Sequence, residues 1–189
     1  MNYTIDKWFP KSIYYVDNLH IENLLKYIKE VKKIKNTKKT FHIDVESSHF
    51  LEEVHNKAMF KELFDDILNH CRNYASNLGY SKKYCDSLKI TNSWFNVSKK
   101  GDSLLKHIHP VSLFSGAFYI KSNKDDFITF YKEDDMTLPP ENFNELSYEY
   151  CSYQCKEGKL LIFKSNLNHS TNRQNGKEKI VISFNVDIK

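Results

Sequence analysis

The segment at residues 88–121, LKITNSWFNVSKKGDSLLKHIHPVSLFSGAFYIK, gives the clearest indication of the architecture. Its short β-prone runs lie at 88–97, 104–109 and 114–121. A turn signal around Gly101 and Asp102 separates the first two runs. Short runs bounded by such turn residues predict β-strands.

Four further β-prone runs follow toward the C-terminus, at 127–131, 146–155, 159–163 and 179–188. Turn residues separate them, including Glu157 and Gly158, and Pro139-Pro140 marks a surface loop. Seven short strands at this spacing favour a sandwich or barrel over alternating βαβ units.

Before residue 88 the apolar pattern is helical. Apolar residues recur at helical spacing over 18–35, with lysines on the opposite face. Asp17 or Asn18 is the expected N-cap. Residues 36–40 are expected to form the exit loop.

A second helix is predicted over 51–78, with a break near Asn56. Gly79 is its expected C-terminal stop, because glycine tolerates the left-handed backbone that ends a helix. Its His55 and His70 lack partners at ligand spacing, so we expect neither to bind a metal.

The composition predicts one globular domain, since the chain has 189 residues and 40% hydrophobic residues. The net charge is +4, and lysines cluster between Lys26 and Lys39. We interpret this cluster as a solvated helix face, because no aromatic–basic motif accompanies it. A nucleic-acid partner is therefore not favoured.

The N-terminus lacks an apolar signal segment, and no apolar run is long enough to span a bilayer. The four cysteines are accordingly expected to be reduced thiols that serve as packing residues. These features predict a cytoplasmic protein without a membrane partner.

Three histidines form the strongest candidate site. His107 and His109 are two positions apart on a predicted strand, so their side chains share a face. His169, far along the chain, would complete a metal site with open coordination positions. Imidazole suits iron, zinc, copper and nickel alike, so these residues do not name the metal.

Several motifs occur in an order that resembles a known family. They are WFPKSI at 8–13, WFN at 94–96, HIHP at 107–110, SGAFY at 115–119, GKLLIFKS at 158–165, and KIVISFN at 179–185 after His169. The set is similar to the small 2-oxoglutarate/Fe(II) oxygenase-like proteins of bacteria and phages. The resemblance is dense in the second half of the chain and sparse in the first.

The resemblance implies a mainly β fold, with a double-stranded β-helix (jelly-roll, cupin-like) core over 88–189. Residues 1–87 would be a helical support within the same domain. It also implies Fe(II) bound by His107, His109 and His169. The superfamily uses an H-x-D/E…H triad, so His109 occupies the carboxylate position. Asp102 is an alternative source of the missing anion.

The resemblance further implies 2-oxoglutarate as cosubstrate. Lys179 stands where the family has an arginine that anchors the distal carboxylate, and Tyr119 matches a tyrosine that donates its hydroxyl to that group. Arg173 and Lys177 are competing cations, and Arg173 could face either the mouth of the site or solvent.

Strand periodicity adds four candidate pocket residues. Trp94 and Asn96 share a face, as do Ser183, Asn185 and Lys179. Asn96 and Ser183 are candidates for binding the cosubstrate, and Trp94 and Asn185 for lining the substrate pocket.

The predicted function is hydroxylation of a C–H bond in an unidentified small molecule or peptide, with conversion of 2-oxoglutarate to succinate and CO2. The loops at 98–104 and 132–143 are expected to border the mouth, and the acids Glu133, Asp134 and Asp135 to be solvated. A three-histidine dioxygenase without 2-oxoglutarate and a non-catalytic jelly-roll binding module stay open. So does a homodimer.

Overall fold

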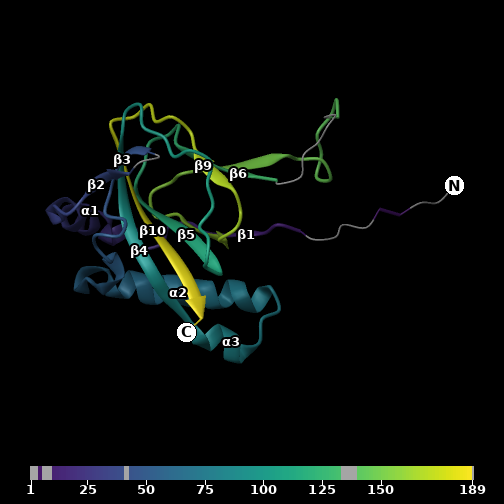
Figure 1. Cartoon of the computed structure of the whole chain (residues 1–189), viewed down its shortest axis with the longest axis horizontal. Coiled ribbons are helices and arrows are strands. Elements are labelled where there is room, and N and C mark those ends of the chain that lie inside the picture. Colours follow the sequence, from purple (N-terminus) through teal and green to yellow (C-terminus); the bar gives the residue numbers. More distant parts are fainter. Residues whose placement is uncertain (1–3, 6–9, 41–42, 133–139, 189) are drawn as a thin grey trace.

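The structure is a computed structural model that describes residues 4–5, 10–40, 43–132 and 140–188 (Figure 1). Its core consists of two antiparallel sheets. The larger sheet has the strand order β1-β8-β5-β10-β4-β3-β2 and the smaller has the order β7-β6-β9. The strands are β1 (Ile13–Val16), β2 (Lys38–Thr40), β3 (Ile43–Ser47), β4 (Leu88–Lys99), β5 (Phe114–Lys121), β6 (Phe127–Tyr131), β7 (Tyr150–Gln154), β8 (Leu160–Lys164), β9 (His169–Thr171) and β10 (Glu178–Ile188).

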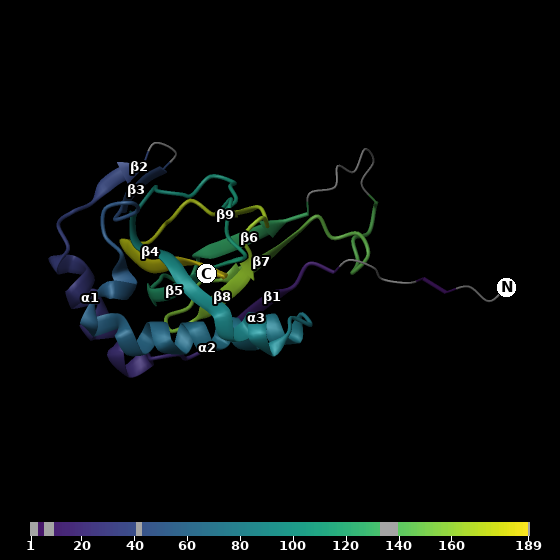
Figure 2. The same cartoon turned by 60° about the horizontal axis from the view of Figure 1, so that its bottom comes forward.

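Helices cover one face of the larger sheet. They are α1 (Leu24–Lys33), α2 (Lys61–Asn77) and α3 (Lys82–Ser87), with 3-10 turns η1 (Ile21–Asn23), η2 (Val54–Asn56) and η3 (Ala58–Phe60). Figure 2 shows α2 running beneath this sheet. In the described part of the chain, no helix is long and apolar enough to cross a bilayer.

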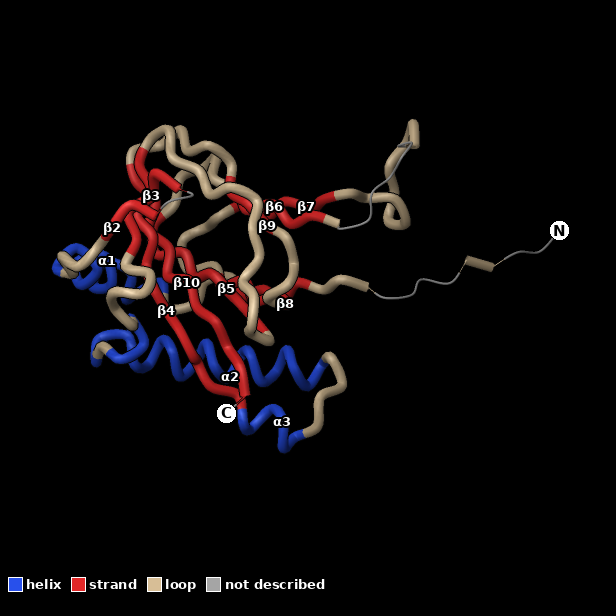
Figure 3. The backbone as a smooth tube through the Cα atoms, in the orientation of Figure 1, coloured by secondary structure: helices blue, strands red, loops and turns tan. Residues whose placement is uncertain are grey.

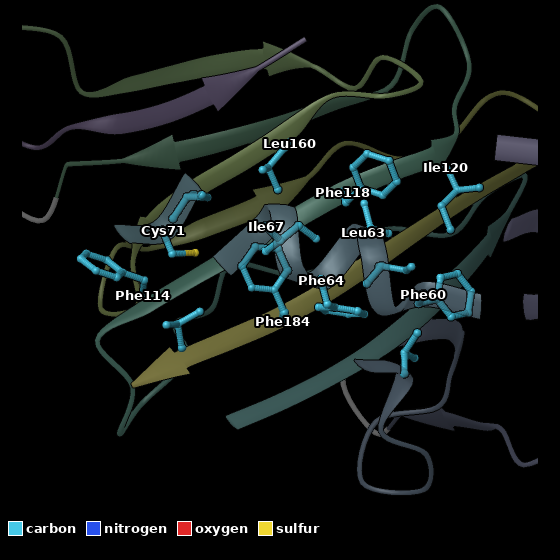
Figure 4. Packing of buried hydrophobic residues seen from close by; sticks show 14 of the residues in the cluster. Phe60, Leu63, Phe64, Ile67, Cys71, Phe114, Phe118, Ile120, Leu160 and Phe184 are labelled. Atoms are coloured by element: carbon cyan, nitrogen blue, oxygen red, sulfur yellow. The ribbon is translucent and has the colours of Figure 1, made fainter. Parts of the chain in front are cut away.

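The main hydrophobic core lies between α2 and the sheet. Leu63, Phe64, Ile67 and Cys71 recur at helical spacing on α2 and are buried against apolar strand residues such as Phe184 (Figure 4). This apolar stripe explains why α2 packs on the sheet. Residues from both the helical and the β-rich parts of the chain therefore share one core.

Strand β10 separates this core from the space between the two sheets. Ile180, Ile182 and Phe184 point toward the helices and are buried in the main core. Lys179 and Ser183 alternate with them and line a cavity on the opposite face. Period-two alternation of a strand thus places polar groups in the interior of the jelly roll.

The structure confirms the predicted mainly β fold with a double-stranded β-helix core. Strands β5 and β6 have the bounds that the sequence predicted. The strand predicted at 104–109 is wrong, because this segment makes only one isolated bridge, between His107 and His169. The chain bends at Lys106, and Pro110 has no N–H to continue a ladder.

The predicted N-terminal elements differ more from the structure. Asp17 forms an ion pair with Lys159 at 2.9 Å, and helix α1 begins only at Leu24. Neither Asp17 nor Asn18 caps a helix: the N-cap of η1 is His20, with a left-handed backbone. The predicted exit loop contains β2, which pairs with β3.

The second predicted helix is interrupted near Asn56, as expected, by the 3-10 turns that precede α2. Gly79 follows α2 with a φ of 86°, and its N–H donates a hydrogen bond to the Ser76 carbonyl. These features match the predicted C-terminal stop. Strands β1, β2, β3 and β9 and helix α3 were not predicted.

Candidate metal centre and cosubstrate pocket

His107, His109 and His169 converge between the two sheets. Their ring centroids are 4.3 Å apart for the pair His107–His169, 5.0 Å for His109–His169 and 5.3 Å for His107–His109. One ligand atom from each ring lies within 4.8 Å of the others. This spacing and donor set fit a single divalent metal ion with open positions.

Backbone hydrogen bonds position the three rings. The amides of His107 and His169 each donate to the carbonyl of the other, at 2.9 and 3.0 Å. The amide of His109 donates to the Ser165 carbonyl at 2.9 Å. The irregular segment that carries His107 and His109 is therefore fixed against the start of β9, a strand of the small sheet, and against the loop before it (Figure 3).

Each imidazole also has an oxygen acceptor at Nδ1. The acceptors are the Leu105 carbonyl at 2.6 Å, the Leu167 carbonyl at 2.9 Å and Asn185 Oδ1 at 2.9 Å, for His107, His169 and His109 respectively. Ser115 Oγ donates to the same Asn185 oxygen at 2.8 Å. Because these oxygens accept, Nδ1 carries the proton in each ring, which makes Nε2 the nitrogen whose lone pair can bind a metal.

Burial keeps two of the three rings, those of His109 and His169, neutral. Burial lowers the pKa of His109 to about 4, and it lowers the pKa of His169 to about 3 with further help from the neighbouring imidazoles. A metal ligand must be the neutral imidazole. His109 and His169 are therefore in their ligating protonation state at neutral pH.

The histidines line a cavity of about 800 Å³ that also contains the buried end of Lys179. Lys179 is only 2% exposed. Within the described ranges, its ammonium makes no hydrogen bond or ion pair with another residue. No described residue that lines the cavity is an aspartate or glutamate. A buried cation without a protein partner indicates a binding site for an anion.

Tyr119 and Cys155 lie beside Lys179. Burial raises the pKa of Tyr119 well above its ordinary value, and it raises the pKa of Cys155 to about 11. The interaction between the two side chains raises the pKa of Tyr119 further, and Lys179 opposes part of the shift at Cys155. Both groups are neutral at physiological pH, so neither neutralises the ammonium.

The other predicted pocket residues also line this cavity: Trp94, Asn96, Ser183 and Asn185. Asn96 Nδ2 donates to Ser183 Oγ at 3.3 Å, which connects β4 to β10 across the cavity wall. The sheet register explains the grouping, because Ser183 pairs with Trp94 on β4 and with Ala117 on β5.

Arg173, Lys177 and Asp102 lie outside the cavity. Arg173 is exposed, and its Nε donates to the Gly101 carbonyl at 3.1 Å. Lys177 is also exposed. Asp102 Oδ2 accepts from the Lys99 amide at 2.7 Å and borders a separate, smaller cavity. The three-histidine cluster therefore contains no carboxylate from Asp102.

Four residues at the cavity mouth were not predicted to line a pocket: Lys38, Lys39, His49 and Phe50. The assignment of Lys38 and Lys39 to the solvated helix face is wrong, because both lie in β2. For His49 and Phe50 the only local signal is a polar, turn-forming stretch that begins at Ser47. Of the loops expected at the mouth, the first contributes Ser98 and Leu104. Residues 133–139 of the second, with its three acids, lie outside the described residues.

A family model described as "Putative 2OG-Fe(II) oxygenase" matches residues 92–185. The matched segment begins in β4 and ends in β10, so it contains all three histidines and Lys179. No curated protein matches the sequence.

Solved structures similar to this one share its fold at low sequence identity. A prolyl-4-hydroxylase from Pseudomonas putida has a TM-score of 0.69 at 9% identity, over 95% of this chain and 94% of that chain. HygX from Streptomyces hygroscopicus, solved with nickel, 2-oxoglutarate and hygromycin B, has a TM-score of 0.68 at 11% identity, over 95% and 84%. The alpha-ketoglutarate-dependent epimerase SnoN from nogalamycin biosynthesis has a TM-score of 0.66 at 10% identity, over 94% and 79%.

Proposed function

The chain belongs, through residues 92–185, to the 2OG-Fe(II) oxygenase family, and we propose that it is an Fe(II)- and 2-oxoglutarate-dependent oxygenase that hydroxylates a C–H bond of its substrate. One observation carries the proposal. Three imidazoles whose ligand atoms lie within 4.8 Å of one another share a cavity with a buried lysine that has no anionic partner among the described residues.

In this proposal His107, His109 and His169 hold the iron. Their Nδ1 atoms are already committed to oxygen acceptors, so each ring is oriented before the metal binds. Asn185 acts as a positioning residue for His109, because its side-chain oxygen fixes that ring from β10.

Lys179 would pair with the distal carboxylate of 2-oxoglutarate. A lysine ammonium is a compact charge with three donors, whereas an arginine would form a planar bidentate fork. Tyr119 lies beside it with its hydroxyl protonated, so it can donate to the same carboxylate. Asn96 and Ser183 would contact the cosubstrate from the neighbouring strands.

When held by the three histidines, Fe(II) with 2-oxoglutarate and O2 would supply the oxidising power, with succinate and CO2 as coproducts. The protein's own contribution is to bind, orient and exclude water. The apolar residues Ala117, Ile128, Phe163 and Val181 line the cavity beside the histidines, which limits the water that reaches them.

His109 gives the centre one negative charge fewer than the superfamily's carboxylate would. The cavity wall does not restore that charge, since its described residues include no acid. A dianionic cosubstrate compensates for this excess of positive charge, which supports 2-oxoglutarate over a neutral ligand.

Two further proposals concern the whole chain. We propose that 1–87 and 88–189 form one domain, because both parts contribute to the main core. We also propose a cytoplasmic location, since all four cysteines are free and three of them are buried.

The test is anaerobic calorimetry with Fe(II) and 2-oxoglutarate, followed by succinate measurement after O2 is admitted. We expect one metal site, 2-oxoglutarate binding that depends on the metal, and succinate formation that is lost in His107→Ala and His169→Ala. His70→Ala is the matched control, because His70 contacts Tyr14 far from the cavity and should leave all three readouts unchanged.

Two results would contradict the proposal. A protein that binds iron but not 2-oxoglutarate would be a three-histidine dioxygenase of another kind. A protein that binds no iron, even when Fe(II) is added, would be a jelly-roll binding module. If succinate forms but the substrate product carries no new hydroxyl group, only the hydroxylase assignment fails.

A further inference from the structure

Aromatic rings form a continuous series from the histidine cluster to the mouth of the cavity. The Trp94 ring lies 5.5 Å from His109 and 4.2 Å from His49, measured between centroids. His49 in turn stacks on Phe50, at 3.8 Å and an interplanar angle of 23°. We call Trp94, His49 and Phe50 the aromatic ledge.

The outer end of the ledge is exposed and conformationally strained. Phe50 is 76% exposed, although one face of its ring is covered by His49. Its φ is 64°, a left-handed conformation that is costly for a bulky residue. Such strain persists only where the surroundings impose it, and it is frequent at binding sites.

The turn that holds Phe50 is anchored from below. The buried Ser48 makes two hydrogen bonds with the backbone of Phe95. Its amide donates to the Phe95 carbonyl at 3.1 Å, and its Oγ accepts from the Phe95 amide at 3.1 Å. The Ser48 carbonyl accepts from the amides of Leu51 and Glu52. The ledge is therefore fixed to β4 before any ligand arrives.

Two lysines line the cavity beside the ledge. Lys38 Nζ lies 5.9 Å from the centroid of the Phe50 ring, and Lys39 also lines the cavity. Burial, together with Lys38, lowers the pKa of His49, so this ring stacks in its neutral form. With no carboxylate among the described lining residues, the mouth attracts anions.

We propose that the substrate is an elongated molecule with an aromatic ring that stacks on Phe50 and an anionic group, phosphate or carboxylate, that pairs with Lys38. This inference rests on the proposed function, because it assigns the part of the substrate that remains outside while the reacting carbon lies near the histidines. Stacking on an exposed ring and pairing with a flexible lysine tolerate variation in the remainder of the molecule.

The experiment is calorimetry on the full chain loaded with Mn(II) and saturated with 2-oxoglutarate. The probes are adenosine monophosphate, indole-3-acetate, adenosine and ribose 5-phosphate. We expect an aromatic anion to bind at least about tenfold more tightly than adenosine or ribose 5-phosphate, because stacking and charge each contribute. The two aromatic anions distinguish phosphate from carboxylate.

Variants locate the binding site. Phe50→Ala should weaken the binding of the aromatic anion about tenfold, whereas Phe50→Tyr should bind the anion with unchanged affinity. Lys38→Gln should weaken the binding of the aromatic anion about threefold or more at low salt, and by a smaller factor at high salt. Tyr84→Ala removes an exposed ring on α3, away from the cavity, and should change nothing.

The outcomes separate the two proposals. If 2-oxoglutarate binds but no aromatic anion does, or if Phe50→Ala has no effect, the inference fails and the proposed function stands. Equal binding of adenosine and its monophosphate overturns the anionic assignment. If aromatic anions bind in a Phe50-dependent manner but 2-oxoglutarate does not bind, the ledge is a binding site and the proposed function fails.

Discussion

Lys179→Met should change cosubstrate affinity and stability in opposite directions. The side chain is 2% exposed and makes no ion pair with any described residue, so the folded protein without ligand carries a buried charge that nothing in the described ranges compensates. Methionine has a similar length and no charge. The ligand-free variant should therefore be more stable, by about 1–3 kcal/mol.

The same substitution should weaken 2-oxoglutarate binding. Truncating one partner of a buried charge pair costs about 2–5 kcal/mol. Since about 1.4 kcal/mol corresponds to a factor of ten, the Kd should rise by roughly 30- to 3000-fold. Lys179→Arg keeps the charge and should restore most of the affinity, with a geometry set by its planar fork.

Calorimetry with Mn(II) measures the affinity, and urea unfolding of the metal-free protein measures the stability. Lys159→Met is a matched control, because Lys159 is also buried but forms an ion pair with Asp17 at 2.9 Å. That variant should lose stability and keep its affinity for 2-oxoglutarate. A Lys179→Met protein with unchanged Kd, or with reduced stability, would refute the assignment of Lys179 as the anion anchor.

Three further predictions test the surroundings of the site. Gly116→Ala should destabilise the protein by about 2–3 kcal/mol in urea unfolding, because a Cβ there would lie 2.2 Å from the Phe184 ring; a loss below half of that range would contradict this packing. Asn185→Ala should weaken Mn(II) binding about 10- to 100-fold by releasing His109, and an unchanged calorimetric Kd would show that this contact is dispensable. Hydrogen bonds from two lysines lower the pKa of Glu178 in the folded protein. The ionised carboxylate therefore stabilises the fold above the pKa that it has in the unfolded chain, and this stabilisation is lost as the pH falls through its lower pKa in the folded protein. Glu178→Gln should therefore cost about 0.5–1 kcal/mol at neutral pH and almost nothing near pH 3, and an equal loss at both pH values would refute the ion-pair explanation.

The central strands were predictable because their pattern is local. In β10, buried apolar residues alternate with Lys179, Ser183 and Asn185, so the period of two gives both the element and its cavity face. The same reasoning placed His107 and His109 on one face. The two histidines do lie together although the strand assignment at 104–109 was wrong. An extended segment keeps alternate side chains on one side even where it forms no ladder with a neighbouring strand.

The elements that the sequence did not reveal depend on distant partners. Strand β1 pairs with β8, and the short strand β9 is defined by pairing with β6. Neither has a long alternating pattern of its own. Of the aromatic ledge, Trp94 was predicted to line the pocket, whereas His49 and Phe50 were missed for a related reason. The exposure of Phe50 follows from a left-handed turn anchored on the Phe95 backbone, and residue types alone do not predict such a turn.

One face of β10 packs in the main core and the other lines the cavity, so residues cannot be inserted into or deleted from this strand without disturbing both. Inserting or deleting one residue within Glu178–Ile188 would exchange the two faces of every position beyond it. Phe184 would then enter the polar interior, and an amide or hydroxyl would be forced against α2. Natural variation in length should therefore be confined to loops, such as the one that follows β9, while this strand keeps a constant number of residues.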